Sequence, residues 1–254
     1  MFFRKNTNQK RDVSDSFEEE NKSDTITQEK ILEFMKRDRE MHIKASYERI
    51  IDVAKTYSHG STKEEYLMLL DYLIDTLLDD VCTSVVVEPL TRFVNGALPE
   101  PFPNVYIDEK GNRHCICPKT KTAVDLSTAK IYVRPWNNDR TKKSMKRLSK
   151  EDFTYYEDNH WSIFYTDINL CYVYNGNHSI NAGRYFHKGT IFSRKYDLPE
   201  IYPYCMTDGL NWYNTFTNQV LSKVSDFRLA AVYTLAQMRY TVKNQAEGSC
   251  FLYI

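Results

Sequence analysis

Three prolines at alternate positions divide this 254-residue chain into two parts with different hydrophobic periodicity. Pro99, Pro101 and Pro103 lie within residues 97–105, where we predict a linker because proline interrupts helices and central strands. Apolar residues recur at helical spacing before this segment and in short, strand-like runs after it. The chain is therefore predicted to be α+β, with a helical region over 26–97 and an α+β domain over 98–254. The sequence leaves open whether the two share one core.

The chain begins with a polar segment. Residues 1–25 are mixed in charge and poor in apolar anchors, so we expect a mobile arm. A helical pattern starts at Ile26 and ends at Gly60. Its apolar stripe is formed by Ile31, Leu32, Met35, Ile43, Tyr47, Ile50, Ile51 and Ala54.

A second helix is predicted over residues 62–95. Ser61 and Glu64 have the spacing of a capping box, in which each side chain bonds a free backbone N–H group. Pro89 predicts a break in this helix, and Asn95-Gly96 predicts its end.

The part after the prolines contains short predicted strands. Lys110-Gly111-Asn112 between two short runs favours a hairpin over residues 105–117. The remaining expected elements are strands at 131–133, 162–166 and 170–174, a helix from Ile180, an irregular aromatic segment over 192–212 and a closing helix over 219–240.

Charge and composition limit the classes of function. Lysine plus arginine number 34 and aspartate plus glutamate number 34, which excludes a histone-like or acidic-tail protein but not a local basic patch. The 19 Tyr, 13 Phe and 3 Trp predict a core rich in tyrosine, with base stacking as the alternative role for some of them.

The sequence indicates a cytoplasmic protein that does not cross a membrane. No uncharged apolar run approaches the roughly 18 residues that a membrane helix needs. The amino terminus lacks the apolar region of a secretory signal, so we expect the six cysteines to be reduced.

The strongest local signal for chemistry lies in residues 170–185. An apolar strand runs through Leu170–Tyr174 into Asn175-Gly176 and then into a helical pattern. Unpaired N–H groups at a helix start bind phosphate, and Gly176 allows a ligand close to the backbone. Side chains available there are those of Asn177, His178 and Ser179, with Arg184 reaching the site only from its flank.

A second signal lies upstream in residues 130–150. This stretch holds eight lysines and arginines against Asp139 alone, a local net charge of +7 in a neutral chain. Such an excess attracts phosphate groups, although a solvated helix face is the alternative interpretation.

Together these signals resemble the ParB/sulfiredoxin superfamily over about residues 125–190. The resemblance rests on Arg134-Pro135-Trp136-Asn137-Asn138-Asp139-Arg140 after a strand, and on Asn175-Gly176-Asn177-His178-Ser179 opening a helix after a later strand. It implies a small mixed sheet with flanking helices and a pocket for nucleotide phosphates. Members of the superfamily include nucleotide-hydrolysing DNA clamps, sulfiredoxins, nucleases and kinases.

The chain departs from the superfamily pattern at informative positions. Ser179 stands where an arginine is usual, which Arg184 or Arg140 would have to replace. No cysteine precedes His178 and no helix-turn-helix is evident, so neither sulfiredoxin chemistry nor a partition clamp is expected.

The resemblance assigns provisional roles to the site residues. Phosphate binding falls to Arg140, Gly176, Asn177, Ser179 and Arg184. Catalysis falls to His178 as general base and to Asp139, which would hold Mg²⁺ or Mn²⁺ or orient a water molecule. The alternatives are a structural role for His178 and a helix-capping role for Asp139.

Two weaker candidates for a metal site lie outside these two signals. His114-Cys115-Ile116-Cys117 lacks the spacing of a zinc site, which Cys171 or Cys205 would have to complete. Four dispersed carboxylates offer a second possible metal centre, namely Asp152, Glu157, Asp158 and Asp167.

The leading hypothesis from the sequence is a protein that binds a nucleotide or nucleic-acid phosphate and acts as a metal-dependent nuclease or nucleotide hydrolase, in phage defence or a mobile element. A non-enzymatic adaptor that binds a protein partner through its N-terminal helices is the alternative. Single-strand binding through the aromatic side chains and the basic stretch is a third hypothesis.

Overall fold

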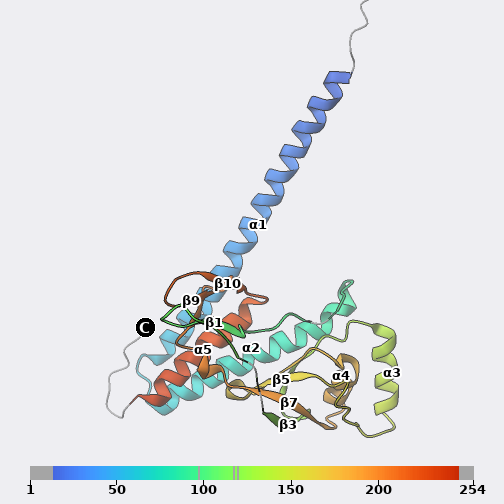
Figure 1. The fold of residues 1–254 in the computed structure, drawn as a ribbon, viewed down its shortest axis with the longest axis vertical. Helices are drawn as coiled ribbons and strands as arrows, with labels where there is room; N and C mark the ends of the chain where they lie inside the picture. Colours follow the sequence, from blue (N-terminus) through green and yellow to red (C-terminus); the bar gives the residue numbers. More distant parts are fainter. Residues whose placement is uncertain (1–13, 97, 117, 119, 246–254) are drawn as a thin grey trace, which may run out of the picture. The chain divides into compact units, whose positions relative to one another are not determined.

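The computed structural model describes residues 14–96, 98–116, 118 and 120–245, and it has the predicted α+β class (Figure 1). The chain divides into two units, residues 1–42 and 43–254. The boundary falls inside the first helix, α1 (Ser14–Ser58), which begins twelve residues before the predicted start at Ile26. Residues 14–25 of the predicted arm are therefore helical, and residues 1–13 lie outside the described part. The remaining helices and strands all belong to the second unit.

The second helix, α2 (Lys63–Thr91), has a capping box one residue later than predicted. The N–H of Glu65 donates to the Thr62 hydroxyl (3.2 Å), and the N–H of Thr62 donates to the Glu65 carboxylate (2.8 Å). Ser61 instead donates to the carbonyl of Tyr57. The predicted break at Pro89 is also wrong, because α2 continues through this proline to Thr91 and the N–H of Arg92 still donates to the carbonyl of Glu88.

A five-stranded mixed sheet forms the centre of the second unit, in the order β3-β7-β5-β6-β4. Its strands are β3 (Lys121–Asp125), β4 (Lys130–Tyr132), β5 (Ser162–Tyr165), β6 (Leu170–Val173) and β7 (Thr190–Tyr196). The β4–β6 and β5–β7 pairs are parallel and the others are antiparallel. The strands predicted around residues 131, 163 and 171 are confirmed as β4, β5 and β6.

Two smaller sheets accompany the central one. The predicted hairpin is confirmed as β1 (Val105–Ile107) and β2 (Arg113–Cys115). A three-stranded sheet is formed by β8 (Cys205–Thr207), β9 (Asn211–Asn214) and β10 (Val220–Lys223). The segment over 192–212 is thus not irregular, and residues 219–224 are not helical. The last helix, α5 (Phe227–Asn244), begins where the Asp226 carboxylate accepts a hydrogen bond from the N–H of Arg228.

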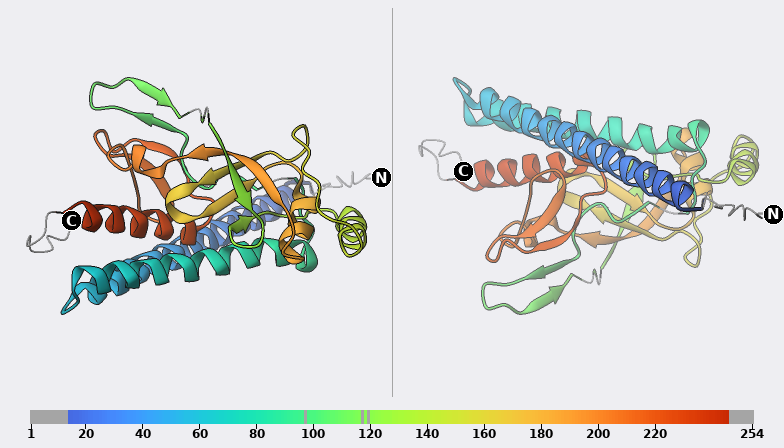
Figure 2. Two further views of the ribbon diagram at one scale, coloured as in Figure 1. Left: turned by 90° about the horizontal axis from the view of Figure 1, so that it is seen from below. Right: turned by 90° about the horizontal axis from the view of Figure 1, so that it is seen from above.

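Two hydrophobic clusters cover opposite faces of the central sheet. The larger one joins α2 and α5, which lie alongside each other (Figure 2), to sheet residues such as Tyr165 and Tyr196. The smaller one joins Ile131, Val173 and Ile191 to Ile180 of α4 (Asn177–Tyr185).

The proline segment is part of this core and not a linker. Leu98 and Phe102 are buried in the larger cluster. Because prolines donate no backbone hydrogen bond, the segment's carbonyls depend on donors from elsewhere: the hydroxyls of Tyr172 and Tyr196 donate to Leu98 and Pro103, each over 2.6 Å. The predicted tyrosine-rich core is confirmed, and its hydroxyls attach this segment to the sheet.

No helix among the described residues is long and apolar enough to cross a membrane.

Candidate functional site

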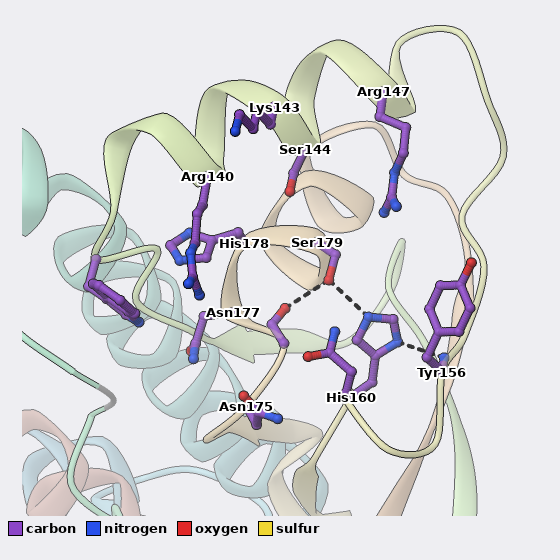
Figure 3. Close-up of a pocket in the computed structure, with 13 residues that line it drawn as sticks. Arg140, Lys143, Ser144, Arg147, Tyr156, His160, Asn175, Asn177, His178 and Ser179 are labelled. Carbon is purple, nitrogen blue, oxygen red and sulfur yellow. Dashed lines mark hydrogen bonds between the residues drawn. The ribbon is translucent and has the colours of Figure 1, made fainter.

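A pocket of about 390 Å³ lies between α3 (Asn138–Leu148) and the start of α4 (Figure 3). The two helices pack against each other, and the segment before β5 lines another side of the pocket. The pocket is lined by Trp136, Arg140, Lys143, Ser144, Arg147, Tyr156, Asn159, His160, Asn175, Gly176, Asn177, His178 and Ser179. Both sequence signals, the basic stretch and the glycine turn, therefore contribute to one site.

Gly176 shapes the floor of the pocket. Its φ of +80° lies in the left-handed region, and an added Cβ would meet Cδ2 of His160 at 2.6 Å and the carbonyl oxygen of Asn159 at 2.9 Å. Glycine meets both requirements, because it adopts a positive φ without strain and has no Cβ that would clash with His160 or Asn159. This turn starts α4 at Asn177, three residues before the predicted start at Ile180.

The first turn of α4 presents free backbone donors. No side chain caps the helix, and within the described chain the N–H groups of Asn177, His178 and Ser179 have no hydrogen-bond acceptor. Such groups carry partial positive charge and are the usual binding points for anions at a helix start.

Three cations on one face of α3 oppose this turn. Arg140, Lys143 and Arg147 recur at three- and four-residue spacing, which places them on the same side of a helix. Figure 3 shows Arg140 and Arg147 extending from α3 toward α4. The Asn137 side chain caps α3 by accepting a hydrogen bond from the N–H of Arg140.

The pocket has cations and no carboxylate. None of its lining residues is Asp or Glu, and in the described part of the chain Arg140, Lys143 and Arg147 form no ion pair. Other members of the basic stretch are neutralised elsewhere: Lys130 by Asp79 (2.7 Å) and Arg134 by Glu88 (2.9 Å). Three of the cations left without an ion pair in the described chain line the pocket, whereas Lys142, Lys146 and Lys150 lie outside it.

His178 is held as a neutral imidazole at the pocket wall. The Thr141 hydroxyl donates to the carbonyl of Asn137 (2.9 Å), so it accepts from Nδ1–H of His178 (3.1 Å). Burial and the charge of Arg140 lower the pKa of His178 to about 4. The remaining nitrogen, Nε2, is buried and has no partner among the described residues.

His160 lines the pocket, and the sequence did not reveal it as a candidate. Its Nδ1 accepts from the N–H of Tyr156 (3.0 Å), so the proton lies on Nε2 and is donated to Ser179 Oγ (2.9 Å). Ser179 in turn donates to the carbonyl of Gly176 (3.1 Å). Because His160 is a donor here, it does not activate Ser179 as a nucleophile. Burial and Arg147 lower the pKa of His160 to about 4.

Two of the predicted site residues lie outside the pocket. Asp139 is exposed in the first turn of α3 and is not among the lining side chains. Arg184 lies in the last turn of α4 and its charge acts on Cys82 of α2, away from the pocket. Arg140, Gly176, Asn177, His178 and Ser179 are brought together as predicted.

The predicted metal ligands are dispersed. No group of three His, Cys, Asp or Glu side chains suited to a metal occurs within the described ranges. His114 bonds Asp108 in the hairpin, Cys171 and Cys205 are buried, and Cys117 lies outside the described residues. Three of the other carboxylates have separate partners: Asp152 pairs with Lys188 (3.7 Å), Glu157 with Lys121, and Asp167 accepts from Tyr202 (2.9 Å).

Residues 8–246 match the model of a family of unknown function, DUF6710. The chain belongs to this family. No curated protein and no solved structure matches the chain. The resemblance to the ParB/sulfiredoxin superfamily stays a prediction.

Proposed function

We propose that this member of DUF6710 binds a phosphate-bearing ligand, a nucleotide or a nucleic acid, in the pocket between α3 and α4. The observation that carries the proposal is the juxtaposition of unpaired cations with unpaired backbone donors. Arg140 and Arg147 on one helix oppose the free N–H groups of residues 177–179 on the other. A phosphate group carries the negative charge and the acceptor oxygens that both sets require.

The neutral histidines favour an anion over a cation in this pocket. Each has a lowered pKa because burial disfavours its charged form and, to a smaller extent, because a neighbouring guanidinium opposes its protonation: Arg140 for His178 and Arg147 for His160. A dianionic phosphate would relieve this repulsion. A divalent metal would meet only amides, hydroxyls, neutral imidazoles and cations, and no carboxylate.

The side chains that line the pocket also limit how it could catalyse a reaction. Mg²⁺ or Mn²⁺ would have to enter with the phosphates of the ligand, since the pocket supplies no carboxylate for it. Nε2 of His178 is the one unpartnered imidazole nitrogen in the pocket lining and is the group we assign as base in any phosphate-ester hydrolysis.

A thermal-unfolding screen tests the proposal. The ligands are ATP, CTP, GTP, UTP, thymidine 5′-monophosphate and short oligonucleotides, with and without Mg²⁺. A ligand that binds only the folded protein at 100 times its dissociation constant adds about 2.7 kcal/mol of stability. We expect stabilisation of the wild type that Arg140→Gln/Arg147→Gln abolishes.

The matched control is Lys142→Gln/Lys146→Gln. It removes the same charge from α3 at exposed positions that do not line the pocket. Stabilisation that disappears equally in both double variants would show general charge attraction and would contradict a defined site.

Protein binding is a second candidate function, located in the first unit. The helix carries five large apolar side chains that are each more than half exposed: Ile31, Leu32, Phe34, Met35 and Met41. Such a concentration on one helix favours a protein partner. Pull-down with wild type and with Leu32→Glu/Met35→Glu tests it, and equal recovery of partners would contradict it.

A further inference from the structure

A second pocket adjoins the first one across residues 155–161. It has a volume of about 320 Å³ and shares His160 with the first pocket. It is lined by Lys121, Tyr155, Glu157, Asp158, His160, Trp161, Ser162, Tyr174, Phe192 and Arg194. Tyr156 and Asn159 of the same segment face the first pocket, so the two hollows are separated by one short stretch of chain.

Exposed aromatic rings dominate the second pocket. Trp161 and Phe192 are each 48% exposed, whereas Trp212 and most of the large rings of the core are buried. Tyr174 lies beside Trp161, with ring centroids 6.1 Å apart, and Tyr155 lies against Phe192 at 5.4 Å. A cluster of this kind is open to stacking by a flat ligand.

The polar ends of these rings are already engaged. The indole N–H of Trp161 donates to the carbonyl of Glu157 (3.0 Å), and the hydroxyl of Tyr155 donates to the carbonyl of Phe192 (3.3 Å). The rings are therefore held in place before any ligand arrives, and little side-chain entropy remains to be lost on stacking.

The two pockets differ in net charge, so they suit different parts of a ligand. In the second pocket Lys121 pairs with Glu157, and two cations are balanced by two carboxylates. The first pocket holds three cations and no carboxylate. A ligand that spans both would place phosphates beside α3 and flat, uncharged groups over Trp161 and Phe192.

We propose that the ligand is single-stranded nucleic acid, with its phosphates in the first pocket and neighbouring bases stacked in the second. This inference rests on the proposed function and extends it from any phosphate-bearing ligand to a strand of several nucleotides. A nucleic-acid strand supplies phosphates and flat bases in alternation, which matches the adjacent charged and aromatic hollows.

Fluorescence anisotropy with labelled thymidine oligomers of one to ten nucleotides tests the inference. We expect the affinity to rise at least tenfold between the mononucleotide and the longer oligomers. Trp161→Leu and Phe192→Leu should each weaken oligomer binding about tenfold, because each removes a ring on which one base stacks. Neither should change the affinity for thymidine 5′-monophosphate.

Two control variants make the test specific. Trp161→Phe keeps a ring for stacking and should retain most of the affinity for the oligomers. Phe216→Leu removes a ring that is also 48% exposed but lines neither pocket, so it should bind as the wild type does. Circular dichroism of each variant confirms folding before the binding measurement.

Three results would overturn the inference. Oligomers that bind no tighter than a mononucleotide would leave the phosphate pocket intact but refute the strand. Unchanged oligomer binding by Trp161→Leu and Phe192→Leu would do the same, as would tighter binding of a phosphotyrosine peptide than of any oligomer. If neither mononucleotide nor oligomer binds, or binding ignores Arg140→Gln/Arg147→Gln, the proposed function itself fails.

Discussion

Cations on the two sides of the central sheet have different surroundings. On the side of α2 and α5, Arg228 pairs with Asp226 and Asp80, each over 2.6 Å, and Arg239 pairs with Asp71 and Asp167. On the side of α3 and α4, Arg140 and Arg147 face a pocket without a carboxylate. The first arrangement uses charge to join helices. The second leaves charge available, which is why we assign it to ligand binding.

The largest expected effect comes from exchanging one arginine on each side for glutamine. Arg228 is 17% exposed and bonded to two carboxylates and to Ser84, so Arg228→Gln should lower the free energy of unfolding by about 3 kcal/mol. Arg140→Gln should change it by less than about 0.5 kcal/mol, because Arg140 is exposed and has no ion pair in the described chain. Urea unfolding measures both.

The two variants should rank in the opposite order in their effect on ligand affinity. Arg140→Gln should weaken binding of a phosphate-bearing ligand strongly, and Arg228→Gln should leave it unchanged under conditions where it is folded. If Arg140→Gln and Arg228→Gln changed the free energy of unfolding equally and also changed ligand affinity equally, the two arginines would not have the different roles assigned to them here.

Lowering the pH should reduce the free energy of unfolding, because His160 in the pocket is buried in its neutral form. The pKa of His160 falls from an ordinary value near 6.5 to about 4, so its neutral form stabilises the fold fully above pH 6.5. About 3 kcal/mol of that stability should be lost as the pH falls from 6.5 to 4. In His160→Gln the free energy of unfolding should be lower at pH 7.5 and should depend less on pH.

Urea unfolding at several pH values between 7.5 and 4 measures this difference. Carboxylates titrate in both proteins and cancel in the comparison. Parallel pH profiles for wild type and His160→Gln would show that His160 is not held neutral by its surroundings.

Gly176→Ala should destabilise the protein by about 2–3 kcal/mol. The new Cβ would clash with His160 and Asn159 and would also force alanine into a left-handed conformation. Gly111→Ala is the matched control, since Gly111 has a φ of +83° with nothing within 4 Å of its Cβ position. The control should cost only about 1 kcal/mol. If both variants lowered the free energy of unfolding equally, the close contact between Gly176 and His160 would contribute nothing to stability.

These residues also show what the sequence could predict. The strand, glycine turn and helix around residues 170–185 are local in sequence, so the sequence could predict that Gly176, Asn177, His178 and Ser179 lie between a strand and a helix. Their roles stay a prediction. The cations of α3 followed from charge and spacing. Both signals depend on residues a few positions apart, and their meeting in one pocket was predicted only through the resemblance to a known superfamily.

The features that were missed depend on contacts between distant segments. The strand β7 pairs on both sides, with β3 and β5, and its exposed Arg194 and Lys195 obscured its pattern. His160 joins the site because the segment before β5 packs against Gly176 and Ser179. The terminal helix is confirmed as α5, but its predicted start at residue 219 is too early because residues 220–223 pair with β9. No short-range pattern encodes these contacts.

The smallest expected effect is that of Asp139→Asn. The side chain is exposed and lies outside the pocket lining, so ligand affinity should stay within about twofold of the wild type. A loss of tenfold or more, measured by isothermal titration calorimetry, would restore the role predicted for Asp139 from sequence.

The most direct test of the central claim is a nuclear magnetic resonance titration of the ¹⁵N-labelled protein with thymidine 5′-monophosphate. The N–H groups of Asn177, His178 and Ser179 have no acceptor in the described structure, so their signals should move as phosphate oxygens bind them. The signal of Gly111, in the hairpin, should stay in place. Movement confined to regions outside α3 and the start of α4, or no movement at saturating ligand, would contradict phosphate binding in this pocket.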